Sequence, residues 1–486
     1  MPSPLYLGID VGTSATRVSL VGETGAQVAS AGYPTARDGA GHVEQDPAAW
    51  SGALAAALRE TGADLRAVGA VGLCGQTPTL VPVDATGVPV RPALTWQDTR
   101  ATAEAAELEA RFGDPEPLIG TALPWSAANM PAKLLWLARH EPATLARTRW
   151  LLQPKDLLGL QLTGSPASDP WSSKGLCRVS DCAPAAEVLA ACGWPADACP
   201  PIAAAWEPRG TVTAAAAERF GLPAGIPVTV GWSDALAQTL AAGCYQRGSG
   251  FVFSGTSAIV GAPVSGEDQR AAGLFSVPRS CAPAPLLYGP TQASGASVAW
   301  VARLLGCQPG DVPALAATSG LATPAFVPYL SGERAPLWNT GVRGLLLGLD
   351  ADHGPAEVAR AVLAGTLLSF RHVLDVVESA TGEPVREIEF VGRGAGDPTW
   401  AALALETLGT RVRFHEDAEM SARGAAMLGA LMTGVRLEQA GRELGDRTRS
   451  AEPRPADLER GRLMIARYRQ ASDMALGWMR GMASGV

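Results

Sequence analysis

The tripeptide Gly-Thr-Ser occurs twice in the chain, each time between two apolar runs. The first stretch is LGIDVGTSATRVSLV at residues 7–21, and the second is VFSGTSAIV at residues 252–260. Gly12 and Gly255 lie 243 residues apart, which is half of the 486-residue chain. A repeat at half the chain length indicates two related lobes rather than a solenoid. We therefore predict two domains, an N-terminal lobe at 1–244 and a C-terminal lobe at 245–486.

Length and composition agree with two packed cores and exclude several classes of protein. The chain is 47% hydrophobic and 18% charged, and single cores stop growing near ~250 residues. A net charge of −8 argues against a nucleic-acid partner. Apolar runs fall short of the ~18 residues that span a bilayer, and MPSPLYLGIDVG lacks the basic and apolar regions of a signal peptide, so we expect no membrane partner. Eight cysteines without CxxC spacing favour a reduced, cytoplasmic enzyme.

Strand and helix patterns alternate along the chain, which is typical of an α/β fold. A β-meander is predicted over residues 5–35, with Gly-Thr-Ser as its first turn and Glu23-Thr24-Gly25 as its second. A second meander begins near residue 250. The other predicted elements are helices at 47–61, 101–111, 132–140, 354–380, from 397 and at 423–434, strands at 67–76 and from 387, and a strand, Gly-rich turn and helix at 226–243. The helix at 423–434 is rich in small residues and is expected to pack very closely.

The two Gly-Thr-Ser hairpins have the chemistry of a phosphate-binding cradle. Such a turn presents backbone N–H groups and two hydroxyls in a tight concavity that suits phosphate oxygens. One hairpin alone is weak evidence, because the tripeptide also occurs in ordinary turns. Two of them, each after a strand, predict that one phosphate chain is held from both sides in a cleft between the lobes. The residues concerned are Gly12, Thr13, Ser14, Gly255, Thr256 and Ser257.

Two carboxylates stand near predicted turns, and each has two interpretations. Asp10 precedes the first hairpin. In one interpretation a cation such as Mg²⁺ lies between this carboxylate and a phosphate, which the carboxylate would otherwise repel. In the other, the carboxylate accepts hydrogen bonds from the N–H groups of the turn. Asp234 lies between a strand and a helix. It is interpreted either as the N-cap of that helix or as a general base for phosphoryl transfer. Spacing alone does not decide between these interpretations.

A Gly-rich turn in VGRGAGDPTW at residues 391–400 is a weak nucleotide signal. The stretch lacks the GxGxxG spacing with a following acidic residue that binds dinucleotides, and GxxxxGK[ST] is absent from the chain. The five histidines are dispersed and indicate neither a metal site nor a catalytic triad. Phosphate binding is therefore expected from the hairpins rather than from a P-loop.

Taken together, the segments resemble the FGGY family of carbohydrate kinases, and most of all its xylulokinase branch. The resemblance runs from about residue 5 to 435 in the family's order, and its most specific part is PYLSGERAPLWNTGVRGLLLGL at 328–349. The other matching segments are LGIDVGTSATRVSLV, HVEQDPAAW at 42–50, LTWQDTR at 94–100, LLQPKDLLGLQLTG at 151–164, ASDPWSSKG at 167–175, GWSDALAQTLAAG at 231–243, SGTS and VGRGAGDPTW.

The resemblance implies an α/β fold of two actin-like ATPase lobes, each with a ribonuclease-H-like core, and an ATP cleft between them. It implies that Asp234 is the catalytic base and that Asp10 is the carboxylate on the Mg²⁺ side. ATP-binding residues are then Gly12, Thr13, Ser14, Arg17, Gly255, Thr256 and Ser257, with Gly392, Gly394 and Ala395 at the adenosine. Sugar-binding residues are Gln76, Thr77, Pro78, Trp96, Asp234 and Ala235. Ser-Gly-Glu-Arg at 331–334 is expected to be structural.

The implied activity is transfer of the γ-phosphoryl group of ATP to a primary hydroxyl of a ketose, with D-xylulose as the leading acceptor. D-xylulose kinases usually carry Met-His where this chain has Thr77-Pro78, and Asn where it has Ala235, so another ketose or polyol (L-xylulose, ribulose, glycerol, erythritol) stays open. A non-catalytic ATP-binding sugar sensor also stays open, because Arg393 replaces a glycine of the adenosine motif. The expected partners are a small sugar or polyol and, as an open assembly, a second copy in a homodimer.

Overall fold

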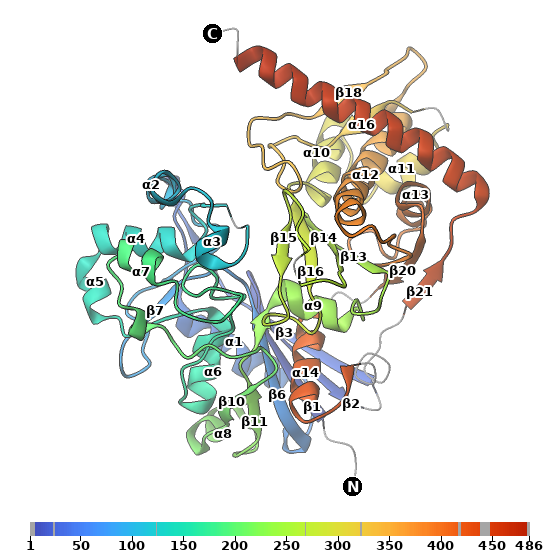
Figure 1. The fold of residues 1–486 in the computed structure, drawn as a ribbon. Coiled ribbons are helices and arrows are strands. Elements are labelled where there is room, and N and C mark those ends of the chain that lie inside the picture. Colours follow the sequence, from blue (N-terminus) through green and yellow to red (C-terminus); the bar gives the residue numbers. More distant parts are fainter. Residues whose placement is uncertain are drawn as a thin grey trace. The chain divides into compact units, whose positions relative to one another are not determined.

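The computed structural model describes residues 5–22, 25–122, 124–267, 269–320, 323–416, 419–437 and 448–483. The chain forms two compact units, and Figure 1 shows their elements. Unit 1 contains residues 1–243, 277–283 and 419–445, and unit 2 contains 244–276, 284–418 and 446–486. The chain first passes into unit 2 at residue 244, whereas the predicted N-terminal lobe runs to 244. The two later segments of unit 1 return to it from the second half of the sequence.

Unit 1 is built on a mixed sheet in the order β10-β11-β6-β1-β2-β3, with β12 paired to β6. Strands β1, β2 and β3 form the predicted meander. Glu23 and Thr24, in the second turn of this meander, lie outside the described residues. Next to β1 runs β6, parallel to it. The bounds are β1 Leu5–Val11, β2 Ala15–Gly22, β3 Gly25–Gly32, β6 Val68–Gly75, β10 Pro208–Thr211, β11 Pro227–Thr229 and β12 Trp232–Ser233.

Helices cover this sheet and extend the unit on one side. The helix α1 begins at Pro47, where the side chain of Asp46 accepts a hydrogen bond from the N–H of Ala48 (2.9 Å), and it buries Trp50 and Leu54. The remaining elements are α2 Thr102–Phe112, α3 Glu116–Ile119, α4 Met130–His140, α5 Pro142–Arg147, α6 Pro154–Thr163, α7 Ala186–Ala191, α8 Ala214–Phe220 and α9 Asp234–Ala241, with the short strands β4 Ala36–Arg37, β5 Val43–Gln45, β7 Val81–Val83, β8 Ala93–Leu94 and β9 Trp150–Leu152.

The small-residue helix α14 (Met420–Met432) packs directly on the backbone of β1 and β6. Gly8 and Gly72 are register partners in these strands. A Cβ on Gly72 would lie 1.7 Å from the carbonyl oxygen of Ala425, and one on Gly8 would lie 1.8 Å from that of Ala422. The predicted close packing of this helix is confirmed, because a side chain on either glycine would occupy the space of the helix backbone.

Unit 2 is built on a second mixed sheet, in the order β15-β16-β14-β13-β19-β20-β21. The bounds are β13 Ser249–Ser254, β14 Ala258–Pro263, β15 Phe275–Val277, β16 Leu286–Thr291, β19 Glu387–Gly392, β20 Arg411–His415 and β21 Thr448–Ala451. Helices α10 Gly295–Leu305, α11 Val312–Ala317, α12 Pro355–Thr381, α13 Pro398–Leu408 and α16 Pro455–Ala483 pack around it, with the small pair β17 Ala325–Val327 and β18 Leu345–Leu347.

The two sheets have the same strand pattern. In unit 1 an antiparallel meander (β1, β2, β3) continues through parallel β6 and β11 to antiparallel β10. In unit 2 antiparallel β13, β14 and β16 continue through parallel β19 and β20 to antiparallel β21. The two Gly-Thr-Ser turns join the corresponding hairpins, β1–β2 and β13–β14. The duplication predicted from the repeat is therefore confirmed at the level of sheet topology.

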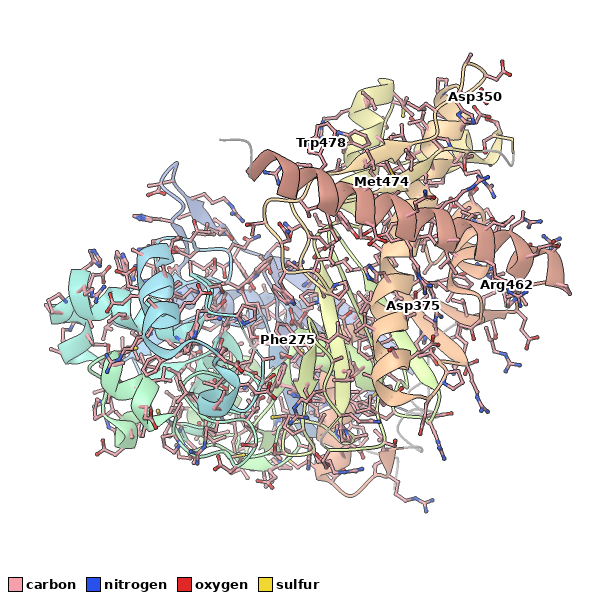
Figure 2. All side chains as sticks on the ribbon, turned by 45° about the horizontal axis from the view of Figure 1, so that its top comes forward. Phe275, Asp350, Asp375, Arg462, Met474 and Trp478 are labelled. Atoms are coloured by element: carbon pink, nitrogen blue, oxygen red, sulfur yellow. The ribbon has the colours of Figure 1, made fainter. Side chains whose placement is uncertain are left out.

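The long helix α16 closes one side of unit 2 and packs against α12, α13 and β17 (Figures 1 and 2). Its Arg469 pairs with Asp375 of α12 at 2.5 Å. Met474 and Trp478, which Figure 2 labels on the same helix, are 48% and 64% exposed. In the described part of the chain, no helix is long and apolar enough to cross a membrane.

Candidate functional site

Three neighbouring parallel strands of unit 1 end at the same edge of the sheet. Val11 of β1 and Ser233 of β12 are both register partners of Gly75, the last residue of β6. The residues that follow these strands are Gly12, Gln76 and Asp234, so the sheet brings them together. Ligands of open α/β sheets bind outside the carboxyl ends of the strands. Three of the predicted residues of the N-terminal lobe therefore lie at such an edge.

Asp10 is a buried carboxylate at this edge, with 3% of its surface exposed. Its oxygens lie 3.6 Å from Nη1 of Arg17 and 3.6 Å from Sγ of Cys74, on the two strands that flank β1. Burial, and to a lesser extent the negative charge of Asp234, raises the pKa of Asp10 to about 7, whereas the positive charge of Arg17 opposes this shift. Two carboxylates therefore repel each other here in the absence of a bound cation.

Arg17 connects this edge to α14. Its Nε lies 2.9 Å from the carboxylate of Glu419, immediately before α14, while its Nη1 faces Asp10. The side chain is 29% exposed, so it is neither a surface residue nor fully enclosed. Nothing in the sequence pointed to Glu419, because about 400 residues separate it from its partner.

The first Gly-Thr-Ser turn is held by side chains that bind its carbonyl groups. The N–H of Gly12 donates to the carbonyl oxygen of Ala15 (3.0 Å), which closes the turn. The amide groups of Gln76 and Gln45 donate to the carbonyl oxygens of Gly12 (3.1 Å) and Thr13 (2.6 Å). The turn is therefore fixed from behind by buried glutamines.

The hydroxyls of this turn differ in their surroundings. Nε1 of the part-exposed Trp96 donates to the hydroxyl oxygen of Thr13 at 3.1 Å, so the predicted sugar residue and the predicted phosphate residue contact each other. Ser14 is exposed. The turn therefore presents one hydroxyl that is already hydrogen bonded and one that is open to a ligand.

Asp234 is the first residue of α9, and Ser233 rather than Asp234 is the N-cap. The hydroxyl of Ser233 accepts the hydrogen bond from the N–H of Leu236 at 3.3 Å. The N-cap interpretation of Asp234 is therefore wrong. Its Oδ1 accepts from the N–H of Ala235 (2.7 Å), and burial raises its pKa to about 6. The helix thus leaves the Asp234 carboxylate available for chemistry.

The segment that departs from the D-xylulose kinase pattern lies beside this carboxylate. Gln76 is 1% exposed, and its Oε1 has no hydrogen-bond partner among the described residues. The Thr77–Pro78 peptide bond is cis. The buried ammonium of Lys133, which the sequence analysis did not select, donates to the carbonyl oxygens of Pro78 (2.9 Å) and Thr95 (2.7 Å) and so fixes this segment.

In unit 2 the second Gly-Thr-Ser turn occupies the corresponding sheet position. The N–H of Gly255 donates to the carbonyl oxygen of Ser257 (2.8 Å). The start of α10 closes on the turn, because the N–H of Gly295 donates to the carbonyl oxygen of Gly255 and that of Ala296 to the carbonyl oxygen of Thr256, both at 3.0 Å. This turn, like the first, follows the end of a strand that has a parallel neighbour, here β19.

The predicted adenosine turn follows β19 directly beside the second hairpin. Ser254 and Gly392 are register partners at the ends of β13 and β19. Gly392 and Gly394 have φ angles of 94° and 91°, in the region that favours glycine. Ala395, the next residue of the turn, is buried. Arg393 is exposed, and a Cβ on Gly295 would lie 2.5 Å from its Nε, so its side chain covers the start of α10.

The Ser-Gly-Glu-Arg segment holds the end of β16, as its structural interpretation predicts. Glu333 is 3% exposed and accepts hydrogen bonds from the N–H groups of Gln292 (2.5 Å) and Arg334 (2.8 Å). The guanidinium of Arg334 donates to the carbonyl oxygen of Thr291 at 2.6 Å. Backbone groups thus bind one oxygen of Glu333 and one nitrogen of Arg334, whereas the buried Oε2 of Glu333 and Nε of Arg334 have no hydrogen-bond partner among the described residues.

A surface cavity of unit 2 lies away from these residues, at the opposite ends of β13, β19 and β20. Its lining includes Arg247, Arg386, Arg411, Glu387 and Glu452. Arg411 pairs with Glu452, and Arg247 pairs with Glu383 outside the cavity lining. Its charges are largely balanced, and it contains no predicted site residue.

The carboxylates of unit 1 suit a magnesium ion that is held mainly by phosphate oxygens and water. Mg²⁺ usually binds one or two carboxylates together with substrate phosphates. Asp10 and Asp234 supply two carboxylates, and burial raises the pKa of both. The described residues hold no group of three or more histidine, cysteine, aspartate or glutamate side chains placed for a metal.

Two duplicated lobes, each with a glycine-rich hairpin at the carboxyl edge of a mixed sheet, define an actin-like ATPase fold. The chain belongs to the FGGY family of carbohydrate kinases: the family's N-terminal domain matches residues 5–241 and its C-terminal domain matches residues 250–433. It is therefore a sugar kinase, an ATP-using phosphotransferase.

Individual relatives extend over nearly the whole chain. The sequence is 31% identical to a xylulose kinase of Escherichia coli over 453 residues, covering 87% of this chain and 89% of that protein. It is also 31% identical to a xylulose kinase of Streptomyces rubiginosus, covering 89% of each. The crystal structure of xylulose kinase from Rhodospirillum rubrum superposes with a TM-score of 0.86 at 26% identity, covering 97% of this chain and 98% of that one.

Proposed function

We propose that this protein transfers the γ-phosphoryl group of ATP to a primary hydroxyl of a ketose, with D-xylulose as the first candidate. The observation that carries the proposal is the convergence of Asp10, the first Gly-Thr-Ser turn, Gln76 and Asp234 at one sheet edge. The relatives named xylulose kinase support the choice of acceptor. The acceptor is thus a small sugar; a homodimer and a cytoplasmic location remain predictions.

Each group in unit 1 has a role that its surroundings support. Asp234 accepts the proton of the attacking hydroxyl, because among the described residues its carboxylate is bound by backbone N–H groups of its own turn, chiefly that of Ala235, and by no side chain. Asp10 would hold Mg²⁺, which supplies positive charge to the phosphate oxygens when bound. Arg17 adds a fixed positive charge and holds Glu419 away from the phosphate. Gln76 and Trp96 contact the sugar in this proposal.

Unit 2 supplies the nucleotide-binding groups in this proposal. The N–H groups and hydroxyls of Thr256 and Ser257 bind phosphate oxygens, and Gly392 and Gly394 let the adenosine approach the backbone. Ala395 is buried and supports the turn from beneath. Arg393, on the exposed side, stacks on the base or lies beside it, and its side chain lies against the start of α10.

The proposal is tested by measuring ADP release from Mg-ATP with a panel of pentuloses, hexuloses, glycerol and tetritols. We expect one strong acceptor, D-xylulose, with little ADP release when no sugar is present. A different single acceptor would keep the kinase activity and change the substrate, and would show what Thr77, Pro78 and Ala235 select. A flat panel with intact ATP binding would contradict the proposal and favour a sugar sensor.

The pH dependence of the reaction follows from the raised pKa of Asp234. A general base must be ionised to accept a proton, and a pKa of about 6 means that the carboxylate is ionised above pH 6 and protonated below it. We therefore expect kcat/KM for the sugar to fall tenfold for each pH unit below about 6. The measurement is a pH profile from 5 to 8 at saturating Mg-ATP. A flat profile down to pH 5 would contradict the assignment.

A further inference from the structure

Lysine is rare in this chain, and every lysine is buried in unit 1. Three of the 39 basic residues are lysines and all the others are arginines. Lys133 and Lys155 are fully buried, and Lys174 is 7% exposed. Every exposed Lys or Arg position of the chain is an arginine. The three buried lysines therefore provide a compact ammonium group, which arginine cannot supply.

Two of the three lysines are satisfied by the protein, and Lys174 is not. Lys155 pairs with the carboxylates of Asp156 and Asp169, and Lys133 donates to three backbone carbonyls. The ammonium of Lys174 donates to one carbonyl oxygen, that of Trp171 at 3.0 Å, and lies 4.9 Å from the ring centre of Trp171. Among the described residues no carboxylate lies within ion-pair distance of Lys174. It therefore keeps N–H groups for another partner.

A buried glutamine links the segment of Lys174 to the predicted sugar segment. The amide oxygen of Gln153 accepts from the N–H of Thr79 at 2.8 Å, and its amide nitrogen donates to the carbonyl oxygen of Ser172 at 2.8 Å. Gln153 is completely buried, so both hydrogen bonds are shielded from water. It fixes Lys174, two residues after Ser172, relative to Thr77-Pro78.

The same lysine interacts electrostatically with the proposed base. The positive charge of Lys174 lowers the pKa of Asp234, and the negative charge of Asp234 raises that of Lys174. Burial outweighs this and lowers the pKa of Lys174 to about 8, so the group is charged at neutral pH at a cost in stability. A buried charge that the fold does not pair is typical of a ligand site.

We propose that Lys174 binds the acceptor, donating hydrogen bonds to a hydroxyl or carbonyl oxygen of the sugar close to the carbon that is phosphorylated. The inference rests on the proposed function and names a specificity-determining residue for it. The chain lacks the Met-His pair and the Asn of the usual D-xylulose pattern, and Lys174 supplies donors in their place. The unpartnered Oε1 of Gln76 supplies the complementary acceptor.

The experiment compares Lys174→Met and Lys174→Gln with the wild type and with a matched control, Arg178→Met. Arg178 is a cation four residues away whose side chain is 43% exposed and pairs with Asp181. The readouts are KM for the sugar, KM for ATP, kcat, the melting temperature and the Kd of the sugar measured by calorimetry without ATP. The binding measurement does not depend on phosphoryl transfer, so it separates this inference from the proposed function.

We expect Lys174→Met to raise both KM and Kd for the sugar about 10- to 100-fold, the range for a lost hydrogen bond to a charged group. KM for ATP should stay unchanged, and the melting temperature should not fall, because methionine fills a buried site without a desolvated charge. Lys174→Gln keeps two N–H donors and should lose less, and Arg178→Met should behave as the wild type. Unchanged sugar binding in Lys174→Met, or equal losses for sugar and ATP with a lower melting temperature, would overturn the inference.

The dependence of sugar binding on alkaline pH gives a second readout. The groups that act on Lys174 are Asp169, Asp234, Cys177 and Cys281, and burial holds the pKa values of both thiols well above their usual range. Between pH 7 and 9 the wild-type Kd for the sugar should rise as Lys174 loses its proton near pH 8, whereas Lys174→Met should show a flat profile. Parallel profiles for the two proteins would contradict direct binding by Lys174. A wild type that binds no sugar at any pH would overturn it altogether.

Discussion

Replacing Asp234 by asparagine is expected to lower kcat by about 10²- to 10⁴-fold, the usual contribution of a general base. Asparagine has the same shape and still accepts the hydrogen bond from Ala235, but it does not take up the proton of the attacking hydroxyl. The start of α9 should be unaffected, because Ser233 provides its cap. The loss should therefore appear in kcat with KM for ATP nearly unchanged.

The stability of the Asp234→Asn protein makes this test specific. A carboxylate whose pKa is raised by folding favours the protonated state, so its ionised form costs stability at pH 7. Asparagine removes that cost and part of the repulsion of Asp10, and the melting temperature at pH 7 should stay the same or rise. A large fall in the melting temperature would mean that the lost activity reflects unfolding.

Asp46→Asn is the matched control for this variant. Asp46 is an exposed N-cap of α1, a position where asparagine is as good as aspartate. It should keep wild-type kcat and stability. If Asp234→Asn retained turnover within a few-fold of this control, the assignment of the base would be wrong. Steady-state ADP release at saturating sugar and Mg-ATP decides between these outcomes.

Much of the fold could be predicted because it depends on local patterns. The hairpins at Gly12 and Gly255 are each specified by a turn between two apolar runs, and their half-chain spacing indicated the duplication. Helix α1 begins at the predicted Pro47, and α12, at 355–381, matches its predicted range to within a residue at each end. Such features require only the residues of the element itself, so a single sequence contains them.

Parts of the site could not be predicted, because they depend on contacts between distant segments. The return of α14 to unit 1 brings Glu419 to Arg17, and hydrophobic periodicity shows which face of a helix is buried but not what covers it. The cap of α9 was misplaced by one residue, since Ser and Asp are equally good caps in adjacent positions. The proposed role of Lys174 has one signal in the sequence, the scarcity of lysine in the chain.

Substitution of Gly72 by alanine is expected to destabilise unit 1 by about 3 kcal/mol or more, at the upper end of the cost of overpacking a core. The added Cβ would lie 1.7 Å from the carbonyl oxygen of Ala425 and 2.6 Å from its carbonyl carbon. Both are backbone atoms of α14, so no side-chain rotation relieves the clash. The helix must move away from β1 and β6.

The same movement should reach the site, because Glu419 immediately precedes α14 and pairs with Arg17. We therefore expect Gly72→Ala to lower the midpoint of urea unfolding and, at temperatures where it stays folded, to lower kcat as well. The control is Gly52→Ala, on an exposed position of α1 where a Cβ meets nothing within 4 Å. This control should gain about 0.5–1 kcal/mol, because alanine favours a helix over glycine. If Gly72→Ala lowers the free energy of unfolding and Gly52→Ala raises it, the loss is due to the close contact of α14 with the sheet. Equal changes in the two proteins would exclude this explanation.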